Sequence, residues 1–390
     1  MPDGWREVAL GEVAAFHNGY PFKPKDFGPT GLPVIRIKQL LDSTEKPDRC
    51  SLPIVPRHRI KNGDLIFSWS GTLAVRIWDR GPALLNQHLF RVEERPGVDR
   101  RWLALALEDA IGELEHKAHG STMRHITKAE LLPHMILVPP LAEQTRIVDL
   151  IAAVDEALQS AVRLSSRCEA VAKRLRAAMF EGSLAHVTFE PLGNLSTARL
   201  GKMLSGASKT GENELPYVRN ADVQWDHVNL NDLHTMTFTT RERAEFSLRK
   251  DDVLVCEGGE VGRSAVVTHD LGDVKFQKAL HRIRCGPRLI PRFLMHYLRF
   301  CAEADRFANY ATQLTIQHLT GEKLRMLPVP VPSIEDQAVT VEALDAVAAE
   351  TRAAVNEADA ISDLRGALFH DLMSGDHRLP LSDEAALGVS

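Results

Sequence analysis

The sequence predicts an α+β protein made of two tandem mixed domains, each followed by a long helix. Three observations support this fold class. The chain has 390 residues, which is long for one core and comfortable for two domains of roughly 140–180 residues each. Its two halves contain the same short motifs in the same order. After each set of motifs, apolar and small residues recur at alternating steps of three and four, as in a heptad repeat.

The internal repeat rests on five pairs of motifs. The first copies are Pro33-Val34-Ile35-Arg36, Gly63-Asp64-Leu65-Ile66, Asn86-Gln87-His88, His125-Ile126-Thr127 and Pro139-Pro140-Leu141-Ala142-Glu143-Gln144. The second copies are Pro216-Tyr217-Val218-Arg219, Asp251-Asp252-Val253-Leu254, Phe276-Gln277-Lys278, His318-Leu319-Thr320 and Pro332-Ser333-Ile334-Glu335-Asp336-Gln337. The offset grows from 183 residues (33 to 216) to 193 (139 to 332) without a change of order. A repeat of this length indicates a duplicated domain rather than a short-period solenoid.

These motifs and periodicities divide the chain into five segments. The predicted segments are a first domain at 1–141, a first long helix at 142–184, a second domain at 185–332, a second long helix at 333–376 and a tail at 377–390. Within the domains, the apolar runs at 65–67 and 253–255 predict buried strands, and glycine-containing turns lead from them into further strands. The segments that begin at Arg101 and Pro291 predict helices.

The two predicted long helices carry matching apolar stripes. The first stripe consists of Ile147, Ile151, Val154, Leu158, Ala161, Ser165, Cys168, Ala172, Leu175 and Met179. The second consists of Leu344, Val347, Thr351, Ala354, Ala358, Ile361, Leu368 and Leu372, with Arg365 on one heptad position. Each helix of about 40 residues would be about 60 Å long, and Gly182 and Gly375 are expected to end them in the left-handed conformation. The stripes would bury each other if the helices pair antiparallel as a coiled coil, with the two domains related by a pseudo-twofold axis.

Composition bounds the class of protein. Apolar residues make up 44% and charged residues 25%, as in an ordinary soluble globular protein. No apolar run approaches the ~20 residues of a membrane helix, and the five cysteines are scattered without a paired motif. We therefore expect a cytoplasmic protein with reduced cysteines and no membrane partner. The net charge of −5 conceals a net −9 over residues 333–390, so the rest of the chain is weakly basic, at +4.

Motifs for catalysis and cofactor binding are missing. There is no glycine-rich dinucleotide fingerprint, no Walker phosphate loop and no Asn-Pro-Pro-Tyr-like tetrapeptide. His116 and His119 have a ligand-like spacing, but no acidic or cysteine cluster accompanies them. We therefore predict no catalytic residue, no metal and no cofactor in this chain.

The chain resembles the specificity subunit of type I restriction–modification systems. The resemblance rests on the Pro-Pro-Leu-Ala-Glu-Gln element at 139–144 and its near-copy at 332–337, on the 62–66 element with the turn after it, on the His-Ile/Leu-Thr elements and on the duplication. It implies two target-recognition domains that each read one half of a split, asymmetric sequence in double-stranded DNA, with the long helices as an antiparallel spacer. It also implies two methyltransferase subunits and the restriction/translocase subunits as partners. S-adenosylmethionine, ATP and Mg would belong to those partners.

Base reading requires Arg or Lys for guanine, Asn or Gln for adenine, and Ser or Thr as adaptable contacts. Candidates in the first domain are Arg36, Lys38, Gln39, Arg76, Ser121, Thr122 and Arg124. Candidates in the second domain are Arg219, Asn220, Arg263, Lys278, Thr312, Gln313 and Thr315. Arg76 and Arg263 follow glycine turns and are expected to hold phosphates. The loops at 121–124 and 312–315 are the strongest candidates, because they are polar and differ between the copies.

Structural alternatives accompany these candidates. Gln87 with Gln277, and His125 with His318, match between the copies, so they are expected to support the shared fold. Any single Arg or Lys could equally belong to a solvated surface, and Trp69 is expected in the core. At the level of the whole chain, the alternatives are a targeting subunit of another phage-defence system and a coiled-coil adaptor that reads no bases. A methyltransferase–specificity fusion is disfavoured because the chain has no methyltransferase motif.

Overall fold

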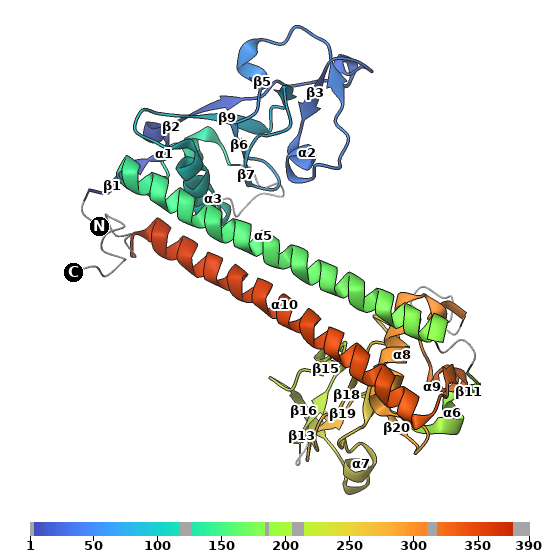
Figure 1. The fold of residues 1–390 in the computed structure, drawn as a ribbon. Coiled ribbons are helices and arrows are strands. Elements are labelled where there is room, and N and C mark those ends of the chain that lie inside the picture. The colour runs from blue at the N-terminus through green and yellow to red at the C-terminus, as the bar shows by residue number, and fades with distance from the viewer. Residues whose placement is uncertain (1–3, 118–125, 184–186, 205–213, 310–317, 377–390) are drawn as a thin grey trace, which may run out of the picture. The chain divides into compact units, whose positions relative to one another are not determined.

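The computed structural model describes residues 4–117, 126–183, 187–204, 214–309 and 318–376 (Figure 1). The chain forms two compact units. Unit 1 combines residues 1–160 with 358–390, and unit 2 comprises residues 161–357. Each unit therefore contains one mixed domain together with parts of both long helices. Within the described residues, no helix is both long enough and apolar enough to cross a membrane.

Unit 1 begins with a small α+β domain. Its strands are β1 (Arg6–Ala9), β2 (Ala14–Asn18), β3 (Leu32–Ile35), β4 (Arg49–Cys50), β5 (Arg59–Ile60), β6 (Leu65–Ser68), β7 (Ala74–Ile77), β8 (Ala83–Leu85), β9 (Leu89–Glu94) and β10 (Met135–Val138). Its helices are α1 (Leu10–Val13), α2 (Ile37–Leu41), α3 (Arg100–Lys117) and α4 (Lys128–Leu131), with 3-10 turns at Pro24–Asp26 and Pro56–His58. Long helix α5 (Leu141–Ala177) follows.

Unit 2 repeats this succession. Its strands are β11 (Phe189–Pro191), β12 (Ser196–Leu200), β13 (Glu214–Val218), β14 (Val223–Gln224), β15 (His227–Val228), β16 (His234–Thr237), β17 (Val253–Cys256), β18 (Ser264–Val266), β19 (Lys275–Phe276), β20 (Leu280–Cys285) and β21 (Pro328–Pro330). Its helices are α6 (Leu192–Leu195), α7 (Thr240–Glu245), α8 (Pro291–Glu303) and α9 (Gly321–Met326), with 3-10 turns at Asn220–Asp222 and Arg306–Asn309. Long helix α10 (Ile334–Ser374) follows.

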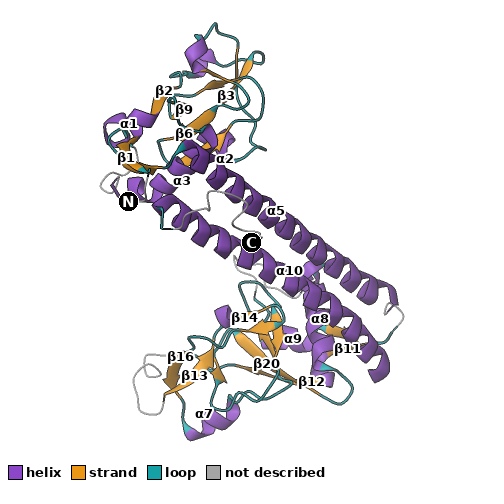
Figure 2. Ribbon diagram, turned by 60° about the vertical axis from the view of Figure 1, so that its left-hand side comes forward, coloured by secondary structure: helices purple, strands orange, loops and turns teal. Residues whose placement is uncertain are grey.

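Strand pairing confirms the duplication. The antiparallel sheet β2-β9-β6-β7 of the first domain corresponds to β12-β20-β17-β18 of the second. A parallel pair, β3 with β8, corresponds to β13 with β19, and β1 with β10 corresponds to β11 with β21. Figure 2 shows strands in orange in both domains. The predicted α+β fold class of two tandem mixed domains with long helices is therefore confirmed.

The predicted buried strands at 65–67 and 253–255 lie at the centre of each domain. In β6, Leu65 and Phe67 pack into one apolar cluster while Ile66 packs into another on the opposite face. β17 divides its residues between two clusters in the same way. Successive side chains of a strand point to opposite faces, so a sheet covered on both sides requires the continuous apolar run that the sequence shows.

The polar turn before each of these strands explains one repeated motif. Gly63 has φ +90° and its counterpart Asp251 has φ +70°, so both adopt the left-handed conformation. The next residue is aspartate in both copies. Asp64 accepts a hydrogen bond from the Lys61 amide at 2.8 Å, and Asp252 accepts one from the Arg249 amide at 2.9 Å. The shared aspartate therefore closes the turn that leads into the central strand.

The predicted heptad stripes are buried or half-buried along both long helices. In unit 1, Ile147 and Ile151 near the start of α5 share a core with Leu372 near the end of α10. In unit 2, Leu344 near the start of α10 shares a core with Phe180 just after α5. The start of α5 therefore packs with the end of α10 in unit 1, and the end of α5 packs with the start of α10 in unit 2, as an antiparallel arrangement predicts. Figure 1 labels both helices.

The two helix ends differ from each other. Gly375 has φ +75° and ends α10 as predicted. The prediction for Gly182 is wrong, because it has no positive φ and lies in a π-helical turn at Ala178–Ser183. The wider turn places Phe180, which is 2% exposed, against the rings of Phe293 and Phe300. Burial of this aromatic side chain in the second domain accounts for the departure from a simple cap.

A buried glutamine joins each long helix to the domain that precedes it. Gln144 accepts a hydrogen bond from the Asp99 amide at 2.7 Å and donates to the carbonyls of Gly97 and Pro139. Gln337 accepts from the Ile290 amide at 2.8 Å and donates to the carbonyls of Arg288 and Pro332. The two side chains are 1% and 0% exposed. The Gln of the repeated Glu/Asp-Gln motif therefore binds the start of the long helix to the segment that leads into α3 or α8 of its domain.

An ion-pair cluster adds a pH-dependent contact in unit 2. Asp345 of α10 accepts from Arg292 at 2.6 Å and from His296 at 2.7 Å, both on α8. Burial raises the pKa of Asp345, but hydrogen bonds from His296 and Arg292 outweigh it and bring the pKa from 3.8 to about 2. A carboxyl whose pKa is lower in the folded state stabilises that state above the unfolded pKa, and this stabilisation disappears as the pH falls through the folded pKa.

We therefore expect Asp345 to contribute about 1 kcal/mol of stability above about pH 4, after a discount for solvent screening of its partly exposed carboxylate. This contribution should be lost as the pH falls toward about 2. Asp345→Asn should remove the acid-sensitive component. Urea unfolding of wild type and variant, followed from pH 7 to pH 2, measures the difference. Wild-type and variant curves that stay equally far apart at every pH would contradict the assignment.

Candidate nucleic-acid interface

The predicted residues of the first domain lie at the end of β3 and along α2 and β7. Arg36 pairs with Asp48 at 2.7 Å and lies over the Phe27 ring at 4.8 Å. Lys38 is exposed and pairs with Glu45 at 3.0 Å. Arg76 is also exposed, and its guanidinium donates to the neighbouring Val75 carbonyl at 2.7 Å. These three cations are accessible from solvent, at least in part.

Gln39 has a different environment. It is 2% exposed, accepts from the Arg36 amide at 3.2 Å and donates to the Lys46 carbonyl at 3.2 Å. In the second copy Asp222 accepts from the Arg219 amide at 2.8 Å and so closes the equivalent turn. Gln39 therefore uses its amide within the domain, in a role that the repeat shares.

The structure brings three of the second domain's predicted residues together. Asn220 donates to the Gly258 carbonyl at 2.9 Å, and its own side-chain oxygen accepts from Arg263 at 3.0 Å. Arg219, next to Asn220, makes bonds of 2.9 and 2.6 Å to the two oxygens of Asp222. Burial raises the pKa of Asp222, but the hydrogen bonds from Arg219 lower it by more. The glycine turn after β17 and the end of β13 thus form one polar cluster.

Arg76 and Arg263 are not structural equivalents. In the first domain Ser68 pairs with Ala74. In the second domain Cys256 occupies the position of Ser68, and its amide donates to the Arg263 carbonyl. Arg263 therefore matches Ala74 and not Arg76. Arg76 lies two residues further along its strand. Their shared place after a glycine turn in the sequence therefore does not give them a shared position in the fold.

Other predicted residues lie elsewhere or outside the described residues. Lys278 is exposed, and its amide donates to the Lys202 carbonyl at 2.7 Å. Trp69 is half-buried and stacks on Phe90 at 5.7 Å, which agrees with the predicted core role. The loop candidates and one histidine of the possible metal pair lie outside the described residues, namely Ser121, Thr122, Arg124, Thr312, Gln313, Thr315 and His119. In the part of the chain that the structure describes, no group of three or more possible ligands could hold a metal ion.

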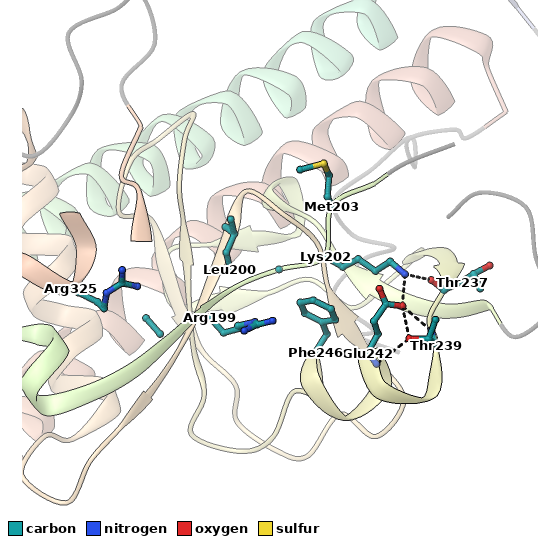
Figure 3. A pocket seen from close by; sticks show the side chains of 11 residues that line it. Arg199, Leu200, Lys202, Met203, Thr237, Thr239, Glu242, Phe246 and Arg325 are labelled. Carbon is teal, nitrogen blue, oxygen red and sulfur yellow. Dashed lines mark hydrogen bonds and ion pairs between the residues drawn. The ribbon is translucent and has the colours of Figure 1, made fainter. Parts of the chain in front are cut away.

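A groove that the sequence analysis missed runs along β12 in the second domain (Figure 3). Its volume is about 800 Å³, and its lining includes the basic residues Arg199, Lys202 and Arg325. The Lys202 ammonium donates to Glu242 and to the Thr237 carbonyl, both at 2.7 Å. The repeat offers a signal that could have found it, because Gly201 aligns with Gly19 of the first domain. Lys202 and Arg199 then align with Tyr20 and His17, and so the copies differ here.

Comparisons with known proteins agree with this duplicated architecture. The family model described as type I restriction modification DNA specificity domain matches residues 2–164 and again 187–358. The chain is 25% identical over 368 residues to the specificity subunit of the Escherichia coli type I restriction enzyme EcoBI, covering 86% of this chain and 77% of that protein.

Two solved structures share the fold. One is the type I restriction–modification S subunit from M. genitalium, with a TM-score of 0.59, 15% identity and coverage of 95% of this chain and 96% of that one. The other is a chain from a structural study of assembly and conformational transition of the type I restriction–modification system, with a TM-score of 0.61, 20% identity and coverage of 97% and 99%. With the family model matched over both repeats, the chain belongs to the family of type I restriction–modification DNA specificity subunits.

Proposed function

We propose that this chain reads a split, asymmetric sequence in double-stranded DNA, with each domain reading one half. The observation that carries the proposal is the match of the specificity-domain family to each of the two repeats. As a specificity subunit, the chain is the non-catalytic DNA-recognition component of its system. Two copies of one fold with different polar side chains suit a target whose two halves differ in sequence.

Polar groups at equivalent places in the two domains support different base preferences. At the end of β3 the first domain has Arg36 followed by Ile37, whereas at the end of β13 the second has Arg219 followed by Asn220. Lys278 of the second domain is exposed. The hydrogen bonds of the two domains match Lys278 with Gln87 of the first domain, and Gln277 with Asn86, so the predicted match of Gln87 with Gln277 is one residue out of register. A lysine can donate to the guanine acceptors of the major groove. The candidate loops at 121–124 and 312–315 remain part of the proposed reading surface.

The proposed partners are two methyltransferase subunits and the restriction/translocase subunits. S-adenosylmethionine, ATP and Mg belong in this proposal to those subunits, and the assembly works on DNA in the cytoplasm. The acidic residues of α10 are a candidate docking face, with Glu342, Glu350, Glu357, Asp359 and Asp363 exposed. Asp345 is not part of that face, because Arg292 and His296 bind it within unit 2.

The test is long-read modification sequencing of a methylation-free host. The host expresses this chain together with the methyltransferase encoded beside it. We expect methyladenine at a split, asymmetric motif that disappears when this chain is omitted. Lys278→Ala should relax a single position in one half of the motif, since a specific base contact contributes about 1–3 kcal/mol of discrimination. Lys250→Ala, which removes an exposed lysine of the same domain, is the matched control and should leave the motif unchanged.

The rival functions give different outcomes. A co-purifying complex that binds DNA without sequence preference, or binds none, would favour an adaptor that reads no bases. A chain whose neighbouring genes encode other effectors and no separate methyltransferase or translocase would favour the targeting subunit of another defence system. Methylation at a motif unaffected by Lys278→Ala would leave the proposed function intact and remove Lys278 from its reading residues.

A further inference from the structure

We propose that the groove along β12 binds the sugar–phosphate backbone of the DNA whose bases the second domain reads. This inference rests on the proposed function and adds a phosphate-binding site made of Arg199, Lys202 and Arg325. All three side chains line the groove, and Figure 3 shows them arranged along it. Phosphate contacts position a protein on the duplex, whereas base contacts specify the sequence.

The basic side chains of the groove are only partly neutralised. Lys202 pairs with Glu242 at 2.7 Å, and Arg199 pairs with Glu245. Arg325, at the end of α9, is exposed, and no ion pair involving it occurs among the residues that the structure describes. The groove therefore keeps one positive charge free, and its other two cations have carboxylate partners that a phosphate can supplement or replace.

A buried arginine adds to the positive potential of this region. Arg282 lies directly opposite Arg199 in the β12–β20 pair, so both side chains project from the same face of the sheet. Arg282 is 9% exposed. Its guanidinium donates to the carbonyls of Glu245 at 3.0 Å and Ser247 at 2.6 Å. Its Nε has no hydrogen-bond partner among the described residues.

The surroundings of Arg282 compensate its charge only in part. Burial lowers its pKa to about 10, and the neighbouring Arg284 acts in the same direction. Arg284 itself is satisfied by Asp252 at 2.7 Å. Asp252 raises the pKa of Arg282 and so offsets part of its charge, but the hydrogen bonds of Arg282 go to neutral carbonyls. The low-dielectric interior screens the remaining field only weakly. An anion in the nearby groove would be attracted by that field, which a surface cluster of paired charges would not provide.

The groove lies next to the candidate reading residue Lys278. Its basic residues occur only in the second of the two aligned copies of this strand. The Lys278 amide donates to the Lys202 carbonyl at 2.7 Å. A DNA backbone bound by Lys202 would therefore pass beside Lys278. In the first domain the aligned residue Tyr20 packs edge-on against Phe22, and His17 pairs with Glu93. The two halves of the target are thus held with unequal electrostatic strength, more strongly by the second domain.

The salt dependence of DNA binding tests this site. The complex with the methyltransferase is titrated with the target duplex and with a scrambled duplex between about 50 and 200 mM salt. Each lost phosphate contact should reduce the slope of log K against log salt by about 0.9. We expect a reduction of about 0.9 for Arg325→Gln and about 1.8 for Arg325→Gln combined with Lys202→Gln. Affinity should fall equally for both duplexes, and the methylated motif should stay the same.

The controls separate this proposal from the proposed function. Lys250→Gln removes an exposed positive charge outside the groove and should leave the slope unchanged. An unchanged slope in the groove variants, with a wild-type complex that still prefers its target, would overturn the phosphate site alone. A changed base preference without a changed slope would also overturn it, since the groove would then contact bases. A wild-type complex that binds no DNA would overturn both proposals. Arg325→Gln breaks no ion pair among the described residues, so it decides the question if the Lys202 variant fails to fold.

Discussion

Arg176→Met is expected to lower the free energy of unfolding of unit 2 by about 3 kcal/mol, at the lower end of the range for breaking a buried ion pair. Arg176 of α5 is 1% exposed. Its guanidinium binds both carboxylate oxygens of Glu303 on α8, at 2.9 and 2.5 Å, and Glu169 at 3.2 Å. Loss of the arginine leaves Glu303, with a side chain only 17% exposed, to Arg299 alone, which bonds it at 3.2 Å.

The other long helix supplies a comparison for this prediction. Arg365 of α10 follows a leucine as Arg176 does, and it binds Asp155 at 3.0 Å and Glu108 at 3.2 Å. Those carboxylates are 40% and 46% exposed, so solvent screening reduces the expected cost of Arg365→Met to about 1 kcal/mol. Hydrogen exchange, read separately for residues of each unit, measures both losses. Equal losses for the two variants would contradict the role given to burial.

Gln337→Leu is expected to cost about 3 kcal/mol, because it leaves the Pro332 carbonyl, which is buried, and two partly buried backbone groups without their partner. Gln144→Leu should have a similar effect through the equivalent three bonds in unit 1. Each variant should reduce protection from hydrogen exchange mainly around its own helix start. Gln224→Leu, at an exposed position of β14 with one bond to the Ala221 carbonyl, is the control, with an expected cost below about 0.5 kcal/mol. If Gln337→Leu also costs less than about 0.5 kcal/mol, the contact between the helix start and its domain does not depend on the glutamine.

The architecture was predictable because its signals are local or repeated. The heptad stripes lie on contiguous helices, and the apolar run 253–255 with a polar turn before it reads as a buried strand without knowledge of its neighbours. The two-residue strands, such as β4 and β14, have no such signal, since they exist only through their partners. The π-helical turn at Ala178–Ser183 depends on where Phe180 finds an aromatic pocket, which no local pattern encodes.

The candidate site was less predictable, because exposure and pairing depend on tertiary contacts. Gln39 has the chemistry of a base-reading residue, but its position in a turn buries it. Arg76 and Arg263 follow similar turns but differ in strand register. The groove joins Arg199 and Lys202 to Arg325, more than 120 residues away in the sequence. Only the comparison of the two copies, which shows where they differ, would have directed attention to Lys202.

The division into units has an evolutionary consequence. The boundary of each compact unit cuts through both long helices, so neither repeat contains all the residues of one unit. In unit 2 the end of α5, from the first repeat, is covered by the start of α10 from the second, and in unit 1 the end of α10 is covered by the start of α5. A single ancestral repeat would have exposed its helix stripe until it met another copy. A repeat taken alone would therefore need a second copy to bury its stripe, and joining two repeats in one chain lets the two domains differ while the helix pairing is kept.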